Sequence, residues 1–338
     1  MRPPRVCAVV LSWNHRDEVA AFVSRASASG PPAARPAFVI VDNGSTDGSV
    51  THFRERLPDV PVIENGRNLG FAGGMNRGIE FALAGGFDYA WLLNTDMELP
   101  ESTLQTLLDR IAGVRNVGLA SPVVVNAAHR DRWVWGGGGY DLERGAMIPW
   151  ARRDIELHRI APGVIDTDRQ MGTALLVSLS MVREIGKLDE RLFAYYEDDD
   201  ISMRARAAGY ASVICTDAFV YHDTPSFRDK SPLACYLYAR NAFLLWLPRL
   251  RGRHRRAFLR RQIAQTLALS GEVKAQPAHA QAVLEGIHDG LDGVTGERPA
   301  TPRPLPAWLR IAGRKPYLVA NLMLGYFGRI LRALLGQH

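Results

Sequence analysis

The chain has 338 residues, of which 47% are hydrophobic and 22% charged, so it is long enough for one large domain with an appendage or for two domains. Its three cysteines, Cys7, Cys215 and Cys235, are too few and too scattered for a disulfide framework or a zinc cluster. Neither a transmembrane helix nor a signal peptide is expected, because no uncharged apolar stretch reaches about 18 residues and the first apolar run has only about six. These features together predict a cytoplasmic protein.

The first third of the chain alternates between patterns typical of buried strands and of helices. Apolar, strand-like runs cover residues 6–13, 37–43, 60–65 and 87–96. Apolar residues at helical spacing follow each of them, over residues 17–26, 48–57, 71–86 and 100–112. This alternation predicts an α/β fold with a mostly parallel central sheet flanked by helices. In such sheets ligands bind outside the carboxyl ends of the strands.

The rest of the chain has shorter strand patterns and then becomes helical. Strands are predicted over residues 118–126, 132–141, 173–180 and 211–222, with a helix over 180–192. After Thr224, helices are predicted over residues 233–250, 251–269 and 314–335. Residues 275–308 contain several Pro and Gly residues and are predicted to be a loop.

The net charge of +6 is unevenly distributed along the chain. From Pro225 onward there are 18 basic and 6 acidic residues, whereas the first 224 residues hold 23 basic and 29 acidic ones. A basic tail on a mildly acidic body indicates a polyanionic partner, and either nucleic acid or an anionic membrane surface would fit. The basic helices of the tail are amphipathic and could lie in a membrane interface, or their apolar faces could pack on the domain.

Polar side chains gather where the predicted strands of the first third end. We expect Asp42 to accept hydrogen bonds from a nucleotide base or ribose, while Ser45, Thr46 and Asp47 have structural roles. A glycine-rich loop from Asn68 to Ile79 would let a ligand approach the backbone at the start of a helix, although it matches neither a dinucleotide nor a P-loop fingerprint. The strand-end residues are Ser12, Asn14, Asp42, Asn43, Asn65, Asn94, Thr95 and Asp96.

A divalent cation is predicted at Asp96, because a carboxylate just past an apolar strand can hold a metal that bridges a diphosphate. Asn94 stands where a second carboxylate would help, so we assign His222, at the end of another predicted strand, as the second ligand. Arg228 lies in the polar loop that follows and could neutralise a leaving diphosphate.

Four consecutive acids, Glu197 to Asp200, follow the apolar and aromatic stretch "LFAYY" and precede a helical pattern. Acids at a helix start are favoured by the helix dipole, which accounts most naturally for Asp199 and Asp200. A general base needs a carboxylate whose pKa is tuned by its neighbours and by partial burial. The residues alone therefore leave helix capping and catalysis both open for this run.

The segments "VDNGSTDGS", "NLGFAGGMNRGI", "WLLNTD", "GTALLVSLSMVREIGKLDERLFAYYEDDDISMRARAAGY" and "VYH" together resemble the family 2 inverting glycosyltransferases of GT-A fold, and especially their rhamnosyltransferase-like members. The resemblance covers about residues 6–245. It implies transfer of a sugar from a nucleotide-diphospho sugar, dTDP-rhamnose or a UDP-sugar, to an acceptor hydroxyl. It also implies that residues 1–224 form the catalytic domain, with a nucleotide-binding half at about 1–116 and an acceptor half at about 117–224, followed by a basic helical region over 225–338.

Roles for individual residues follow from the same resemblance. Asp198 is the implied catalytic base with Glu197 beside it, and Asp96 and His222 would hold Mg²⁺ or Mn²⁺. Gly172 and Thr173 would line the donor-sugar and acceptor pocket, with Tyr195 and Tyr196 shaping the acceptor side. The stretch "YLYARN", Tyr236 to Asn241, also resembles the family but receives no role. The expected nucleotide contacts are Ser12, Asn14, Asp42, Asn43, Asn68, Gly70, Gly74, Asn76, Asn94, Thr95 and Arg228.

Several features narrow this prediction. The Gln-x-x-Arg-Trp motif of processive synthases is absent, so a single-sugar transferase is expected, and Asn94 replaces the first Asp of the DxD signature. The expected acceptor is a glycan or a lipid-linked glycan in cell-wall or surface polysaccharide assembly, with the tail on the inner membrane face or in a homodimer, and no nucleic acid is expected. A soluble secondary metabolite as acceptor stays open, as do a sugar-nucleotide nucleotidyltransferase and a non-catalytic membrane- or polyanion-binding protein on a transferase fold.

Overall fold

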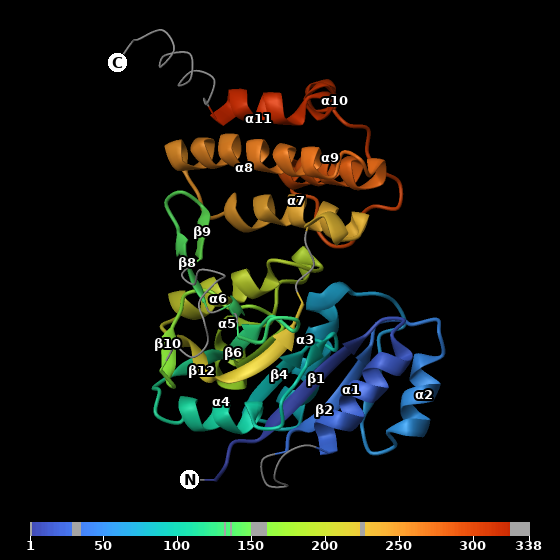
Figure 1. Ribbon diagram of the computed structural model, residues 1–338, viewed down its shortest axis with the longest axis vertical. Coiled ribbons are helices and arrows are strands. Elements are labelled where there is room, and N and C mark those ends of the chain that lie inside the picture. Colours follow the sequence, from blue (N-terminus) through green and yellow to red (C-terminus); the bar gives the residue numbers. More distant parts are fainter. Residues whose placement is uncertain are drawn as a thin grey trace. The chain divides into compact units, whose positions relative to one another are not determined.

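The computed structural model describes residues 2–28, 35–131, 133–135, 137–149, 161–223 and 227–324 (Figure 1). The chain divides into two compact units. The first, which we call the sheet unit, comprises Met1–Tyr140, Met147–Glu190 and Glu197–Thr224. The second, the helical unit, comprises Asp141–Ala146, Arg191–Tyr196 and Pro225–His338.

A ten-stranded mixed sheet forms the centre of the sheet unit, with a main strand order of β10-β12-β6-β11-β4-β1-β2-β3. Strands β1 to β4, β6 and β12 run in one direction, and β11 runs against its neighbours β4 and β6. The main strands are β1 (Val6–Ser12), β2 (Ala37–Asp42), β3 (Val62–Glu64), β4 (Tyr89–Leu93), β6 (Val117–Val125), β10 (Val164–Asp166), β11 (Ala174–Ser178) and β12 (Ala211–His222). Two further strands pair at the side, β5 (Met97–Glu98) with β12 and β7 (Trp133–Trp135) with β6, while β8 (Gly138–Asp141) and β9 (Ala146–Pro149) form a separate pair.

Helices cover both faces of this sheet, because alternate residues of the buried strands point to opposite sides. In β1, Val6, Ala8 and Val10 pack with α1 (Arg16–Ala28), α2 (Ser49–Arg56) and α4 (Thr103–Ile111). Cys7 and Val9 point the other way, toward α3 (Gly70–Ala84), α5 (Leu179–Ile185) and α6 (Glu197–Ala207). The predicted α/β architecture with a mostly parallel sheet flanked by helices is therefore confirmed (Figure 1).

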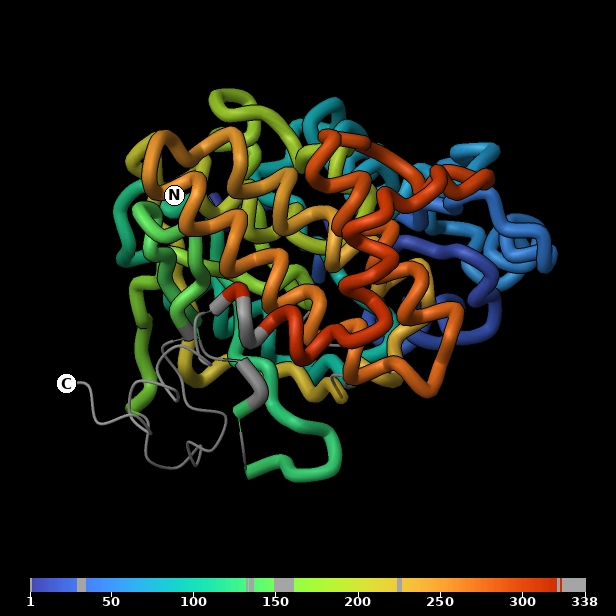
Figure 2. The backbone as a smooth tube through the Cα atoms, turned by 90° about the horizontal axis from the view of Figure 1, so that it is seen from above, coloured from blue at the N-terminus to red at the C-terminus, as the bar shows by residue number. Residues whose placement is uncertain are grey.

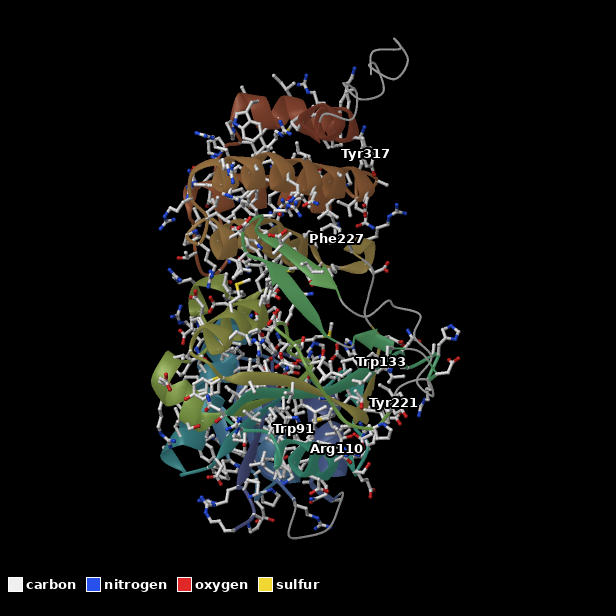
Figure 3. All side chains as sticks on the ribbon, turned by 90° about the vertical axis from the view of Figure 1, so that its left-hand side faces the viewer. Trp91, Arg110, Trp133, Tyr221, Phe227 and Tyr317 are labelled. Carbon is white, nitrogen blue, oxygen red and sulfur yellow. The ribbon has the colours of Figure 1, made fainter. Side chains whose placement is uncertain are left out.

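Trp91 and Arg110, both labelled in Figure 3, illustrate the packing on the face of the sheet that α1, α2 and α4 cover. Trp91 of β4 is 2% exposed and belongs to the core beneath α1 and α4. Arg110 of α4 donates from Nε to both carboxylate oxygens of Asp217 at 3.0 Å, which ties the helix to β12. The same core also contains Val213 and Val220 of β12, so the far half of the sheet is packed against the same layer of helices.

Within its described residues the helical unit contains five α-helices: α7 (Pro232–Trp246), α8 (Gly252–Glu272), α9 (Pro277–Asp292), α10 (Ala307–Arg314) and α11 (Pro316–Leu324). They stack in layers, with α7 against α9 and with α11 against α8, as the orange and red segments of Figures 1 and 2 show. Gly286 of α9 allows the close approach of α7, because a Cβ there would lie 2.5 Å from the carbonyl oxygen of Tyr236. None of the helices in the described ranges is both long and apolar enough to span a bilayer.

The predicted helices at 233–250 and 251–269 are confirmed, but the loop predicted over 275–308 is wrong for much of its length. Pro277 stands in the first turn of α9, where its missing N–H does no harm, and Gly293 ends the helix with a φ of 74°. The Gly and Pro residues that indicated a loop therefore begin, pack and end a helix. The predicted helix over 314–335 is described only as far as Leu324, and residues 325–338 lie outside the described part.

Candidate active site

The predicted site residues of the sheet unit gather at one edge of the sheet. Strands β1, β2, β3, β4 and β12 all end there, because they run in the same direction. Strand β11 runs the opposite way, so the residues just before it, Gly172 and Thr173, come to the same edge. The backbone N–H of Asn94, after β4, donates to the carbonyl oxygen of Thr173 at 3.0 Å. The sequence could not show this neighbour relation, since it depends on the antiparallel insertion of β11.

Among the described residues, three buried oxygen atoms at the ends of β1, β2 and β3 have no hydrogen-bond partner. They are Ser12 Oγ, Asp42 Oδ1 and Asn65 Oδ1. The other carboxylate oxygen of Asp42 accepts from the backbone N–H groups of Gly44 (3.1 Å) and Ser45 (3.0 Å), which fixes the orientation of this side chain. Buried polar atoms without partners are costly in a folded protein. A ligand that donates N–H and O–H groups at this corner, as a nucleoside does, would remove that cost.

Asn43 organises the loop beside this corner. Its amide nitrogen donates to Asn68 Oδ1 and to the carbonyl oxygen of Gly70, both at 3.0 Å. Its amide oxygen accepts from Asn65 Nδ2 (3.0 Å) and from the backbone N–H of Leu69 (3.1 Å). The Asn43 side chain is thus fully engaged by the protein. Asn43 and Asn68, which we predicted to contact the nucleotide, hold the loop beside this corner in shape.

Asn14 acts in a comparable way on the neighbouring loop. Its side-chain oxygen accepts from the backbone N–H of Thr46 at 2.8 Å, and its own backbone N–H donates to Ser45 Oγ at 2.9 Å. Its φ of 59° lies in the left-handed region that Asn tolerates better than most residues. Asn14 therefore couples the end of β1 to the loop after β2.

The helix predicted over residues 71–86 is confirmed as α3 (Gly70–Ala84), but it already includes most of the glycine-rich stretch that was predicted to be a loop. Helix α3 begins at Gly70, so Gly74 lies inside it. A Cβ on Gly74 would come within 2.3 Å of Leu11 Cδ1, so the absence of a side chain lets α3 pack closely on β1. Asn76 is 1% exposed and bonds to Leu188, donating to its carbonyl oxygen and accepting from its N–H at 3.0 Å each. Helix packing accounts for Gly74 and Asn76, whereas Gly70 has a φ of 74° at the first turn.

Asp96 and His222 are brought together although they lie far apart in the sequence. His222 Nε2 is 3.2 Å from Asp96 Oδ2, and the imidazole holds the pKa of this carboxyl below its usual value. The distance suits an ion pair, but the contact lacks hydrogen-bond geometry. Within the described part of the chain, both ring nitrogens of the buried His222 are therefore without a hydrogen-bond partner. The Asp96 side chain is 64% exposed. The other two predicted residues here are engaged by the protein, Asn94 through Thr173 and Thr95 through its hydroxyl, which donates to Glu18 at 2.9 Å.

This pair fits a divalent cation whose remaining ligands come from elsewhere. A carboxylate and an imidazole are both ordinary metal ligands, and the unpartnered nitrogens of His222 are available to one. Across the described residues no group of three or more His, Cys, Asp and Glu side chains is arranged to hold a metal. Two protein ligands with the rest supplied by phosphate oxygens and water is the arrangement that Mg²⁺ commonly takes in phosphate-binding sites.

The acidic run is the first turn of α6, and its four carboxylates have different surroundings. Asp199 is 2% exposed, pairs with Arg169 and accepts from the hydroxyl of Tyr140 at 2.9 Å. Asp200 is also buried and accepts from Arg204 Nε at 2.7 Å, one helical turn further along. Both were predicted as plain helix-start residues, but the structure gives each an arginine. No local pattern in the sequence indicates Arg169, because it lies 30 residues from its partner.

Asp198 differs from Asp199 and Asp200 because its carboxylate lies at the end of the sheet where the parallel strands have their carboxyl ends. Its Oδ2 accepts from the backbone N–H of Gly172 at 3.1 Å, which places the carboxylate beside the predicted sugar pocket. Burial and the charge of Asp199 raise the pKa of Asp198 to about 6, against the opposing effects of Arg169 and the Gly172 N–H. Burial, followed by the charge of Asp198, raises the pKa of Glu197 well above its usual value, and Glu197 Oε2 has no hydrogen-bond partner. A carboxylate with a pKa near neutrality is suited to general-base work.

The residues before α6 belong to the helical unit and have an unusual backbone. Phe193, Tyr195 and Tyr196 have φ values of 66°, 69° and 73°, a region that side chains other than Gly, Asn and Asp adopt rarely. Tyr195 and Tyr196 contact the ring of Tyr238, with centroids 4.4 Å and 5.9 Å away. Lys230 Nζ lies 5.0 Å from the centroid of the same ring. Arg228, which we predicted at the diphosphate, is an exposed residue of this unit.

The mixed sheet with helices on both faces has the GT-A fold of glycosyltransferases. Residues 7–171 match the family model for glycosyl transferase family 2, which confirms the resemblance predicted from the sequence. An N-acetylglucosaminyl-diphospho-decaprenol L-rhamnosyltransferase of Mycobacterium tuberculosis is 29% identical over 216 residues, which cover 59% of this chain and 70% of the relative. The galactofuranosyltransferase GlfT1 of the same species is 28% identical over 240 residues, covering 68% of this chain and 73% of the relative.

Solved structures agree with the fold. A GalNAc-T7 structure with UDP, GalNAc and Mn²⁺ superposes with a TM-score of 0.55 at 14% identity, covering 86% of this chain and 58% of that one. The mannosyltransferase PcManGT of Pyrobaculum calidifontis, in complex with GDP-Man and Mn²⁺, gives a TM-score of 0.50 at 18% identity over 99% of this chain and 88% of the other. At such identities the likeness concerns the fold alone.

Proposed function

We propose that this glycosyltransferase moves one sugar from a nucleotide-diphospho sugar to an acceptor hydroxyl by direct displacement with inversion, with Asp198 as the base. The main support is the position of the Asp198 carboxylate, which accepts a hydrogen bond from the backbone N–H of Gly172 just before β11. The pKa of this carboxyl is raised to about 6. In the step, the acceptor oxygen bonds to the anomeric carbon and gives its proton to Asp198. The bond from the anomeric carbon to the phosphate oxygen breaks, and the nucleoside diphosphate leaves with the electron pair.

The nucleoside would lie at the ends of β1, β2 and β3. The unpartnered oxygens of Ser12, Asp42 and Asn65 support this, because each can accept a hydrogen bond from a base or a ribose. Asn14 and Asn43 would hold the surrounding loops in shape through the contacts described above.

Asp96 and His222 would hold Mg²⁺ or Mn²⁺ on the diphosphate. Bound there, the ion supplies positive charge for the leaving nucleoside diphosphate. The exposed Asp96 carboxylate and the unpartnered nitrogens of His222 support this assignment. Two of the solved structures similar in fold contain Mn²⁺ by their own descriptions.

The donor and the acceptor follow only from likeness to relatives. One relative is by name a rhamnosyltransferase acting on a diphospho-decaprenol-linked sugar, and another is a galactofuranosyltransferase. We therefore propose dTDP-rhamnose or a UDP-sugar as donor, and a glycan or lipid-linked glycan of the cell wall or cell surface as acceptor. A soluble secondary metabolite as acceptor is the alternative.

A thermal-shift panel of nucleotide sugars, each with and without Mn²⁺, tests the donor. The true donor should raise the melting temperature in a concentration-dependent way, because a ligand that binds only the folded state stabilises it. The same mixtures should release nucleoside diphosphate slowly in the absence of an acceptor. A protein that neither binds nor hydrolyses any nucleotide sugar would instead be the non-catalytic binding protein on a transferase fold.

We further propose that the helical unit binds the inner face of a membrane that contains anionic lipids. Four large apolar side chains on α10 and α11, namely Trp308, Ile311, Tyr317 and Leu318, are 42–64% exposed. Three exposed basic residues, Arg310, Arg314 and Lys315, lie among them. Tyr317 is labelled on the outer helical layer in Figure 3. Aromatic and basic residues on one short helical segment are typical of interfacial binding.

Flotation with liposomes tests this surface. The protein should float with vesicles containing phosphatidylglycerol and stay in solution with neutral phosphatidylcholine vesicles. The double variant Trp308→Ser/Ile311→Ser should bind the anionic vesicles roughly tenfold more weakly, because it removes the apolar contact. If wild-type protein stays in solution with the anionic vesicles and is dimeric by light scattering, the surface is a subunit interface instead.

A further inference from the structure

Two adjacent residues of α7, Arg240 and Asn241, are fully buried side chains in the part of the chain that is described. They lie in the stretch Tyr236 to Asn241, which resembles the family and for which the sequence alone indicates no role. Arg240 makes no ion pair in that part of the chain and gives its hydrogen bonds to neutral oxygens. The charge of Asp289 acts on Arg240 without a direct ion pair, and burial lowers the pKa of the guanidinium. A buried guanidinium that makes no direct ion pair is costly, so its position needs a reason.

The two side chains together hold one short segment. Asn241 Nδ2 lies 2.8 Å from each of the carbonyl oxygens of Leu192, Ala194 and Tyr195, so its two hydrogens are shared among three acceptors. Arg240 Nη2 donates to the carbonyl oxygen of Leu192 at 3.0 Å. Arg240 Nε donates to Asn241 Oδ1 at 2.9 Å, which orients the amide so that its nitrogen faces the segment.

A second contact braces the arginine from the other side. Arg240 Nη1 donates to the carbonyl oxygen of Gly296 at 2.6 Å, and the backbone N–H of Gly296 donates to the carbonyl oxygen of Arg191 at 2.7 Å. The guanidinium also lies over the ring of Tyr236, 5.2 Å from its centroid. Four of the five residues from Arg191 to Tyr195, all except Phe193, therefore accept hydrogen bonds through their carbonyl oxygens from residues far along the chain.

The held segment is the strained one. Phe193, Tyr195 and Tyr196 all have left-handed backbone conformations. Such conformations persist in residues other than glycine only where the surroundings impose them, and they gather at functional sites. The next residue along the chain after Tyr196 is Glu197, the first residue of α6, and Asp198 follows it. The backbone angles of the segment therefore set the direction in which the chain enters the acidic pair.

We propose that Arg240 and Asn241 are positioning residues, which clamp the strained segment Leu192–Tyr196 and so place the Glu197–Asp198 carboxylates for reaction. The proposal rests on Asp198 acting as the base, as proposed above. The clamp then does more than stabilise the fold. If the segment relaxes toward ordinary backbone angles, the direction of the chain at the first turn of α6 changes, and the carboxylates move with it. A displacement of the base by about 1 Å can lower the rate about 10²-fold.

Asn241→Asp tests the clamp with almost no change in shape. The carboxylate still accepts from Arg240 Nε, but it removes both N–H donors and turns a negative oxygen toward three carbonyl oxygens. We expect hydrogen exchange of the amides between residues 193 and 198 to become at least about tenfold faster. We expect kcat for release of nucleoside diphosphate to fall about 10- to 100-fold, while KM for the donor changes by less than about twofold.

Gln262→Glu is the matched control, because it makes the same amide-to-carboxylate change in α8, where the side chain bonds to Thr266 within its own helix. It should leave both the exchange rates and kcat unchanged. Arg240→Lys provides a second variant if Asn241→Asp does not fold, since it keeps the charge and loses the planar fork of donors.

The exchange rates and kcat together distinguish a positioning role of Arg240 and Asn241 from a merely stabilising one. Unchanged exchange in the 193–198 segment of either variant overturns the clamp. Faster exchange with unchanged kcat overturns the positioning role and leaves a stabilising contact. A wild-type protein inert toward every donor overturns the proposed function, and in that case the exchange rates alone decide whether the clamp exists.

Discussion

Asp198→Asn is expected to abolish most of the turnover and, at the same time, to stabilise the fold at neutral pH. Loss of a general base typically lowers the rate about 10²–10⁴-fold, and donor affinity should survive because Asp198 is not among the groups assigned to the nucleotide. In wild-type enzyme kcat/KM should rise with pH through about 6, the pKa to which Asp198 is raised, since the base must be ionised to accept a proton. Initial rates from pH 4.5 to 8 measure this limb.

The effect on stability follows from the direction of the same shift. The pKa of Asp198 is higher in the folded protein than in the unfolded chain, so ionisation opposes folding, and wild-type stability falls as pH rises through about 6. The asparagine cannot ionise and escapes this loss. Near pH 7.5 the variant should therefore be more stable by about 1–3 kcal/mol, and the gain should vanish near pH 4. Urea unfolding at both pH values measures the difference.

Asp200→Asn is the matched control, two positions along the same helical turn. Its carboxylate is paired with Arg204, so removal breaks a largely buried ion pair and should destabilise the fold by about 1–3 kcal/mol. Opposite signs at Asp198 and Asp200 would distinguish a carboxylate kept for reaction from one kept for stability. Asp198→Asn with wild-type turnover, or with the same loss of stability as Asp200→Asn, would sink the assignment of the base.

Removing the predicted metal ligands should make donor binding insensitive to Mn²⁺. In wild-type protein, titration calorimetry with UDP or dTDP should give clearly tighter binding with Mn²⁺ than with EDTA. Asp96→Asn and His222→Gln should each weaken binding at least about tenfold in Mn²⁺, with little change in EDTA, because only the metal-bound diphosphate contact is lost. The exposure of Asp96 means that little stability should be lost with it.

Glu98→Gln is the control for this experiment. It removes a carboxylate two residues further on, which is exposed and paired with Arg130 at 2.6 Å. Its binding should match wild type under both conditions. If Asp96→Asn keeps the full enhancement by Mn²⁺, these two residues are not metal ligands, whatever the enzyme's activity.

Several residues of the candidate site could be predicted from the sequence because their signals are local. A buried parallel strand reads as a continuous apolar run, so Ser12, Asp42, Asn94 and Asp96 could be recognised as strand-end residues without knowing which strands pair. Parallel strands bring their carboxyl ends to one edge, which predicted that these side chains would gather. The acidic run from Glu197 to Asp200 could be recognised as a candidate site from its four consecutive carboxylates.

Other features have no local signal. A glycine in the sequence can belong to a loop or to a helix that packs closely on another element. The packing role of Gly74 in α3 and the existence of α9 were therefore not predicted from the sequence. Each was decided by the surface of another element: Leu11 of β1 lies against α3, and Tyr236 of α7 lies against α9.

The sequence by itself determined the alternation of elements, the strand-end polar residues and the identity of the acids at the start of α6. Only the tertiary structure decided how those acids divide, because a carboxylate takes its pKa from its neighbours and from its burial. Arg169 makes Asp199 an ion-pair partner, Gly172 turns Asp198 to the strand edge, and Asn241 reaches 46 to 49 residues back along the chain to hold the turn before them. Partners at such distances are set by how the elements pack, which a periodic pattern in the chain does not encode.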